Sequence, residues 1–167
     1  MKIVVVKGLA GFTKPVYFKL YPGKETAFDG DKVMDRKFNF LLIDDNSADN
    51  FYHKIVIDNT SLAASVLDFQ YAEKALKYFR ESEDPPADIV FLDINMPRMS
   101  GFEFMSFFRD LPEQIIKKTK IIMLTTSLNP ADRDKAGSMA DIISFKNKPL
   151  REEDVYEIVR DHYSDLN

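Results

Sequence analysis

The stretch Asp88-Ile-Val-Phe-Leu-Asp-Ile-Asn-Met-Pro97 places four apolar residues directly before a carboxylate, Asp93. A short run of aliphatic and aromatic residues of this kind is typical of a strand that is buried on both faces of a parallel sheet. In α/β proteins the functional groups lie at the carboxyl ends of such strands. The segment therefore predicts a parallel sheet with Asp93 at its functional edge.

Three other apolar runs also lead into polar groups. Residues 40–43 are followed by Asp44 and Asp45, residues 120–124 by Thr125, and residues 141–145 lead to Lys148-Pro149. Because the carboxyl ends of parallel strands meet at one edge of a sheet, we expect these side chains to lie together.

From about residue 37 onward, short apolar runs alternate with helical patterns, as in a parallel sheet with crossover helices. The expected strands cover residues 38–43, 64–69, 89–92, 120–124 and 141–145. Apolar residues three and four apart predict helices between them. In the first helix the apolar set is Phe51, Tyr52, Ile55 and Val56. Right-handed crossovers then predict a doubly wound α/β fold, a five-stranded parallel sheet in the order 2-1-3-4-5.

The composition bounds the domain organisation. The chain has 167 residues, of which 45% are hydrophobic and 14 are Phe, enough for one domain with a substantial core. We predict that residues 37–167 form this domain and that residues 1–36 are an N-terminal extension of unknown role. In the extension, residues 16–21 and 24–28 flank Pro22-Gly23. This pattern fits either a small hairpin or a leader.

The charge and the cysteine count exclude several classes of protein. The net charge is −4 and spreads along the chain, so there is no basic stripe for nucleic acid. The absence of cysteine excludes disulfides and thiolate metal sites, which fits a cytoplasmic protein. No apolar run is long enough for a signal peptide or a membrane span. We expect a soluble cytoplasmic protein that binds neither nucleic acid nor membranes.

The three aspartates of the predicted edge need a cation. Carboxylates crowded together repel one another and raise each other's pKa values unless positive charge lies among them. Asp44, Asp45 and Asp93 offer only oxygen ligands, with no His or Cys nearby. Oxygen ligands favour Mg²⁺, with Mn²⁺ as the alternative.

Residues 37–165 resemble the receiver domain of two-component response regulators, which has a flavodoxin-like fold. The resemblance rests on the order of the matching residues along the chain and on their spacing. Its elements are the Asp44-Asp45 pair after the first strand, Asp93 after the third, Pro97 and Gly101 four and eight residues further on, Thr125 after the fourth strand and Lys148-Pro149 after the fifth. The absence of an output domain resembles stand-alone, single-domain receivers.

The resemblance implies a role for each matching residue. Asp93 is the phosphoacceptor and a metal ligand together with Asp45. Asp44 binds the metal through water or stands beside it as a fixed acceptor, and Asn95 contributes its backbone carbonyl. The groups expected to bind the phosphoryl group or to switch with it are Thr125, Thr126, Lys148 and Phe145. Structural roles fall to Pro97, Gly101 and Pro149, the last through a cis bond that aims the Lys148 amine into the site.

The resemblance also implies partners. The phosphodonor is a sensor histidine kinase or a histidine phosphotransfer protein, and the chain is not an enzyme beyond its own phosphorylation and dephosphorylation. Phosphorylation is expected to draw Thr125 towards the phosphoryl group, which leaves space for Phe145 to turn inward. Because Phe145 lacks a hydroxyl, its inward state is expected to be favoured even without phosphate. The output face comprises the fourth helix, fifth strand and fifth helix, around residues 132–139 and 153–163. A partner or a second copy of the chain is expected to dock there.

Other interpretations stay open. Asp44-Asp45 before Ser47 also fits a helix cap, and Thr125-Thr126-Ser127 also fits turn chemistry. A haloacid-dehalogenase-like phosphatase also uses an Asp nucleophile with Mg²⁺, but its Asp-x-Asp motif follows the first strand, whereas here Asn95 stands in the third motif position. A phosphorylation-independent receiver-like binding module is the other alternative.

Overall fold

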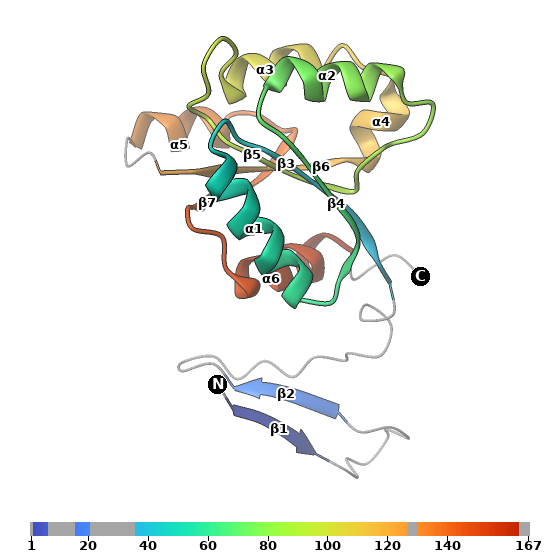
Figure 1. Cartoon of the computed structure of the whole chain (residues 1–167), viewed down its shortest axis with the longest axis vertical. Helices are drawn as coiled ribbons and strands as arrows, with labels where there is room; N and C mark the ends of the chain where they lie inside the picture. The colour runs from blue at the N-terminus through green and yellow to red at the C-terminus, as the bar shows by residue number, and fades with distance from the viewer. Residues whose placement is uncertain (1, 7–15, 21–35, 127–129, 164–167) are drawn as a thin grey trace. The chain divides into compact units, whose positions relative to one another are not determined.

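The computed structural model describes residues 2–6, 16–20, 36–126 and 130–163 (Figure 1). The chain divides into two compact units, Met1–Arg36 and Lys37–Asn167. In the first unit, β1 (Lys2–Val6) pairs antiparallel with β2 (Val16–Leu20). The second strand lies where the sequence predicted one arm of a hairpin, but its observed partner is β1. The other predicted arm, residues 24–28, lies outside the described residues.

The second unit contains a five-stranded parallel sheet. Its strands are β3 (Phe38–Ile43), β4 (Ala63–Phe69), β5 (Ile89–Leu92), β6 (Lys120–Thr125) and β7 (Ile142–Asn147). Their order in space is β4-β3-β5-β6-β7, and every neighbouring pair is parallel. Numbered within this unit, the order is 2-1-3-4-5, which confirms the predicted doubly wound fold.

Helices cover both faces of the sheet (Figure 1). One face carries α1 (Ser47–Asn59) and α6 (Glu152–Tyr163), and the other carries α2 (Ala72–Glu81), α3 (Gly101–Phe108) and α4 (Glu113–Lys118). Ala136 of α5 (Pro130–Gly137) belongs to the same core cluster as residues of α2 and α3. The sequence did not predict α4, because its six residues are too few to establish a helical period and only Ile115 is buried.

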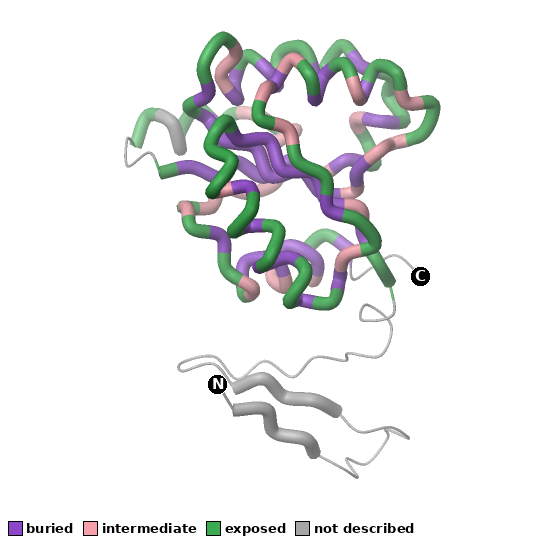
Figure 2. The backbone as a smooth tube through the Cα atoms, viewed as in Figure 1, coloured by how far each residue is buried: buried purple, intermediate pink, exposed green. Residues whose placement is uncertain are grey.

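The central strands form the most buried part of this unit. All four residues of β5 are buried, and Figure 2 shows the burial concentrated in the strands and on the inner sides of the helices. Phe79 of α2 packs against Phe104 and Phe108 of α3, with ring centroids 6.5 and 5.3 Å away. Burying each such side chain contributes about 1.5–3 kcal/mol. The end of β5 therefore belongs to a well-packed core.

Of the four apolar residues that predicted the first helix, only Val56 is buried in α1. Phe51, Tyr52 and Ile55 are 69, 47 and 43% exposed. The buried residues of this helix are Asn50, His53, Val56 and Ile57. Asn50 is buried because its side-chain amide donates to the backbone carbonyl of Asp44 (2.8 Å). His53 is buried as well, with 2% of its surface exposed.

Candidate functional site

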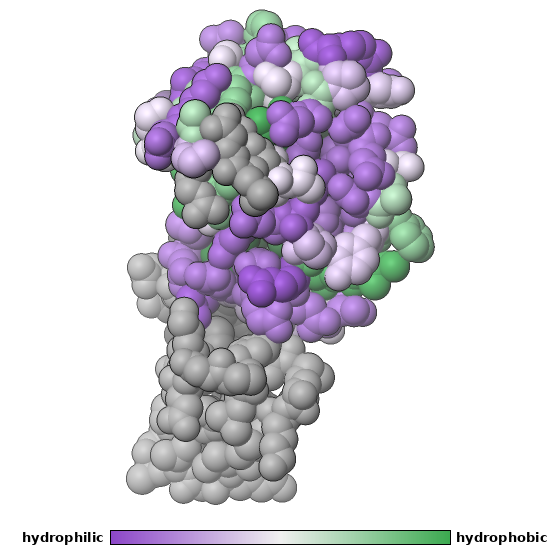
Figure 3. Space-filling view, turned by 90° about the vertical axis from the view of Figure 1, so that its left-hand side faces the viewer, coloured by the Kyte–Doolittle hydropathy of each residue, from purple (hydrophilic) through white to green (hydrophobic). Residues whose placement is uncertain are grey.

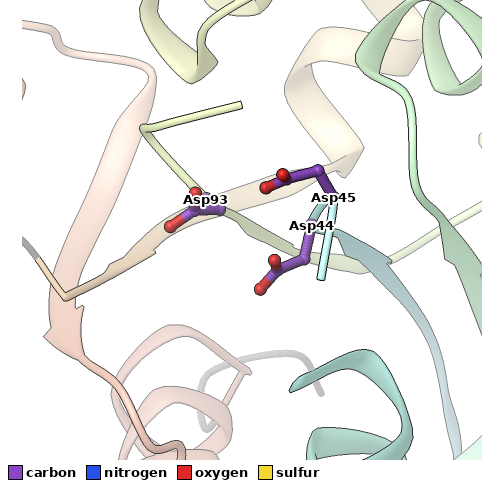
Figure 4. Close-up of side chains that lie close together, drawn as sticks. All are labelled: Asp44, Asp45 and Asp93. Carbon is purple, nitrogen blue, oxygen red and sulfur yellow. The ribbon is translucent and has the colours of Figure 1, made fainter. Parts of the chain in front are cut away.

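Asp44 and Asp93 lie side by side at the carboxyl ends of the neighbouring strands β3 and β5. The ladder between β3 and β5 continues one residue past the strands, because the Asp93 N–H donates to the Ile43 carbonyl (2.9 Å). The Asp44 N–H donates to the Phe69 carbonyl in the same way (3.0 Å). Figure 4 shows the carboxylates of Asp44, Asp45 and Asp93 projecting in the same direction, and one oxygen from each lies within 4.8 Å of the others.

Two of the three carboxylates are buried. Asp44 and Asp93 are 3 and 5% exposed, whereas Asp45 is exposed. Burial is the main cause that raises the pKa of Asp93, and the neighbouring charge of Asp44 adds to it. The charge and hydrogen bond of Lys148 lower the pKa of Asp93, but they do not cancel the increase. The carboxylate that the sequence singled out is therefore held in an environment that disfavours its charged form.

Lys148 supplies positive charge to this cluster. Its Nζ lies 2.5 Å from Asp44 Oδ2, 3.0 Å from Asp49 Oδ2 and 3.3 Å from Asp93 Oδ1. Burial alone would lower the pKa of this ammonium, but the hydrogen bond to Asp44 and the charges of Asp93 and Asp44 outweigh burial and raise it. The Lys148-Pro149 peptide bond is cis and the amine points into the site, which confirms that prediction.

Asp49 was missed by the sequence reasoning. It is the third residue of α1, which begins after Asn46, whose side chain caps the helix by accepting from the N–H groups of Ala48 and Asp49. Because Asn46 directly follows the acidic pair, the first turn of α1 lies next to the site, and Asp49 in that turn contacts the Lys148 amine. An acidic residue in the first turn of a helix that starts at the functional edge was the available signal.

The loop after Asp93 is fixed by close backbone contacts. The Asn95 N–H donates to Asp93 Oδ2 (2.9 Å), and the Gly101 N–H donates to the Ile94 carbonyl (2.9 Å). A Cβ at Gly101 would collide with the Asp93 carbonyl oxygen, so only glycine allows this approach. The helix that follows starts with a capping box between Ser100 and Glu103. Pro97 is exposed in the same loop.

The remaining predicted residues lie on the β6 and β7 side. Thr125 is fully buried at the end of β6, and its carbonyl accepts from the Lys148 N–H (2.9 Å). Thr126 is exposed. Phe145 of β7 is half-buried and packs against the hydrophobic core.

Comparisons with known proteins identify the family. The family model of the response regulator receiver domain matches residues 40–160. The chain belongs to the response regulator receiver family. A receiver protein from Dyadobacter fermentans is 26% identical with a TM-score of 0.67, covering 74% of this chain and 95% of that one. A two-component response regulator from Cytophaga hutchinsonii is 26% identical with a TM-score of 0.68, covering 75% of this chain and 99% of that one.

A plant protein is also similar to this receiver. The two-component response regulator ORR1 of Oryza sativa is 26% identical over 123 residues, which cover 71% of this chain and 52% of the relative. The chain thus spans about half the length of that relative. Within the described ranges of the receiver chain, no helix is both long and apolar enough to cross a bilayer.

The acidic cluster of this receiver fits a hard divalent cation. Receiver domains in general bind Mg²⁺ at an acidic pocket, and the oxygens of Asp44, Asp45 and Asp93 form a cluster with the ligand chemistry of such a site. Both Asp44 oxygens already accept a hydrogen bond, from the Asn46 N–H (3.0 Å) and from Lys148. Asp45 has no hydrogen bond or ion pair with any residue of the described ranges. Asp45 would therefore be better placed than Asp44 to bind the cation directly.

Proposed function

We propose that this receiver accepts a phosphoryl group from a phosphohistidine onto Asp93 in an Mg²⁺-dependent reaction. The observation that carries the proposal is the convergence of the Asp93 carboxylate with two further carboxylates and the Lys148 ammonium. A phosphatase of the haloacid-dehalogenase type is disfavoured because Asp93 follows the third strand of the sheet unit. A phosphorylation-independent binding module is disfavoured because the acceptor, the acidic pair and the lysine are all in place.

The reaction is a substitution at phosphorus. An Asp93 oxygen forms a bond to phosphorus while the bond between phosphorus and the imidazole nitrogen breaks, and the ring leaves as neutral imidazole when its other nitrogen carries a proton. The product is an acyl phosphate. Lys148 offsets charge on the phosphoryl oxygens, and the Thr125 hydroxyl and Thr126 donate hydrogen bonds to them. Asp45, Asp93 and the Asn95 carbonyl would hold Mg²⁺, with Asp44 beside it, and the bound ion would supply further positive charge.

The phosphodonor is proposed to be a sensor histidine kinase or a histidine phosphotransfer protein. Exposed apolar residues on α1, Phe51, Tyr52 and Ile55, offer it a docking surface on the helix that starts beside Asp44. Figure 3 shows a mainly hydrophilic face on which hydrophobic residues gather in small groups, one of them at the right-hand edge. We place this exchange in the cytoplasm, the compartment that fits a chain without cysteine.

We further propose that the receiver signals by docking and is no enzyme beyond its own phosphorylation and dephosphorylation. The output face comprises α5, β7 and α6, where a partner or a second copy of the chain binds. Phe145 supports this assignment because it lies on β7, half-buried against the core, and can turn further inward when Thr125 moves.

The test is labelling with acetyl phosphate and Mg²⁺, followed by intact-mass measurement. The wild-type chain is expected to take up one phosphoryl group and Asp93→Asn none. Asp84→Asn is the matched control, since Asp84 is an exposed aspartate in the loop before β5. Continuous turnover of the donor with no labelled chain would identify a phosphatase, and no uptake at all would identify a binding module. Labelling of Asp93→Asn would refute the acceptor assignment.

A further inference from the structure

We propose that Asp49 is a positioning residue that holds Lys148 in the unphosphorylated receiver and competes with the phosphoryl group for its ammonium. This inference rests on the proposed function and concerns how tightly the site holds a phosphoryl group. Asp49 belongs neither to the acidic cluster of Asp44, Asp45 and Asp93 nor to the loop after β5.

The competition follows from the number of hydrogen-bond donors on the ammonium. A lysine ammonium has three N–H donors and no acceptor. The Lys148 Nζ has three carboxylate neighbours, Asp44, Asp49 and Asp93, at 2.5, 3.0 and 3.3 Å. Its side chain is 9% exposed, which leaves little room for a fourth partner. A phosphoryl oxygen therefore has to displace one of the three carboxylates.

Asp49 is the partner that can be released most easily. Its side chain is 34% exposed, whereas those of Asp44 and Asp93 are 5 and 6% exposed, so water can solvate the freed carboxylate. Asp49 also lies in the first turn of α1, where the positive end of the helix dipole stabilises a negative side chain. Asp44 makes the shortest contact with the Lys148 Nζ, and Asp93 is the residue proposed to carry the phosphoryl group, so neither is as easily released.

The remainder of α1 stays in place during this exchange. Asn50, the next residue, is 2% exposed and its side-chain amide donates to the Asp44 carbonyl (2.8 Å). Asn46 caps the helix independently of Lys148. The exchange therefore requires only rotation of the Asp49 side chain away from the amine.

Removing the Asp49 charge should strengthen phosphoryl binding. The Asp49→Asn variant keeps the shape of the side chain but replaces the carboxylate with an amide oxygen, which is a weaker acceptor for the Lys148 ammonium. It also removes a negative charge that faces the incoming anion. A partly exposed ion pair of this kind corresponds to roughly a two- to fivefold change in affinity. A purely structural role of Asp49 predicts the opposite, because loss of a favourable charge at the helix start can only weaken folding and binding.

The experiment is a titration of the full chain with beryllofluoride, an analogue of the phosphoryl group, at saturating Mg²⁺, followed by amide resonances. Asp49→Asn is expected to bind beryllofluoride more tightly than wild type, and Asp49→Glu, which retains the charge, to return towards the wild-type affinity. Asp58→Asn removes the same charge from an exposed position at the other end of α1 and is expected to match wild type.

The outcomes separate the two proposals. Binding of beryllofluoride by wild type with equal or weaker binding by Asp49→Asn overturns the role of Asp49 and leaves the proposed function intact. Absence of binding by the wild-type chain overturns the proposed function, and the role of Asp49 with it. Tighter binding by both Asp49→Asn and Asp58→Asn shows a general effect of charge and also overturns the specific role.

Discussion

Gly101 offers a sharp test of how the loop after β5 holds the phosphoacceptor. A Cβ on this residue would collide with the Asp93 carbonyl oxygen and would lie 3.1 Å from the Ile94 Cα and 3.2 Å from the Asp93 carbonyl carbon. All three neighbours are backbone atoms, so no flexible side chain can move aside. The Gly101→Ala variant must therefore displace either the start of α3 or the end of β5.

The expected cost of Gly101→Ala follows from this geometry. Inserting a methyl group into a well-packed site typically costs about 1–3 kcal/mol. The upper half of that range applies because the backbone itself has to shift. For a unit of this size, 2 kcal/mol corresponds to a fall in Tm of roughly 5–10 °C. Acetyl phosphate labelling should slow as well, because the displaced carbonyl belongs to the residue that carries the acceptor carboxylate.

Gly137→Ala is the matched control. Gly137 is the last residue of α5, and a Cβ there meets nothing within 4 Å. The same substitution should be neutral or should stabilise the chain by about 0.4–1 kcal/mol, because it reduces the conformational freedom of the unfolded state. Urea unfolding followed by circular dichroism measures both variants. Equal stability of the two variants, or normal labelling of Gly101→Ala, would refute the reasoning.

Two further substitutions test the surroundings of the site. Burial lowers the pKa of His53, so at low pH the unfolded chain binds a proton that the folded chain excludes. The free energy of unfolding should therefore decrease as the pH falls below about 6.5, by at most about 1.4 kcal/mol per pH unit, and urea titrations of His53→Leu should show a smaller decrease. Arg98 lies over the Tyr71 ring, 4.0 Å from its centroid, and 3.4 Å from Glu73 Oε1. Arg98→Ala should cost about 0.5–1.5 kcal/mol in the same assay, whereas the exposed Arg80→Ala should cost close to nothing.

The sheet and the position of Asp93 could be predicted because their signals are local. The run over β5 is apolar at every position, and all of it is buried. The set of apolar residues in α2 has a clean helical period, and Ala72, Ala75, Leu76 and Phe79 are its buried residues. Such a pattern lies within one segment of the sequence and requires only that a hydrophobic core exists. It does not depend on which residues the segment contacts.

The buried face of α1 could not be predicted because tertiary partners decide it. Asn50 is polar in sequence but is buried by its hydrogen bond to a carbonyl that lies six residues earlier in the chain. Phe51 and Ile55 are apolar but face solvent. Asp49 was missed for a similar reason, since its partner Lys148 is 99 residues away and the contact exists only once the sheet has formed.

Thr125 and Lys148, two of the three residues proposed to bind the phosphoryl oxygens, are linked by a backbone hydrogen bond. Thr125 ends β6, and its backbone carbonyl accepts from the N–H of Lys148, so the segment that carries the ammonium is attached to the strand that carries the hydroxyl. Asp93, by contrast, is fixed by the ladder to β3. A phosphoryl group on Asp93 that draws Thr125 towards it therefore acts on Lys148 through the same hydrogen bond. We therefore expect movement of Thr125 to accompany the exchange at Lys148. Phe145 lies on β7, the strand that pairs with β6.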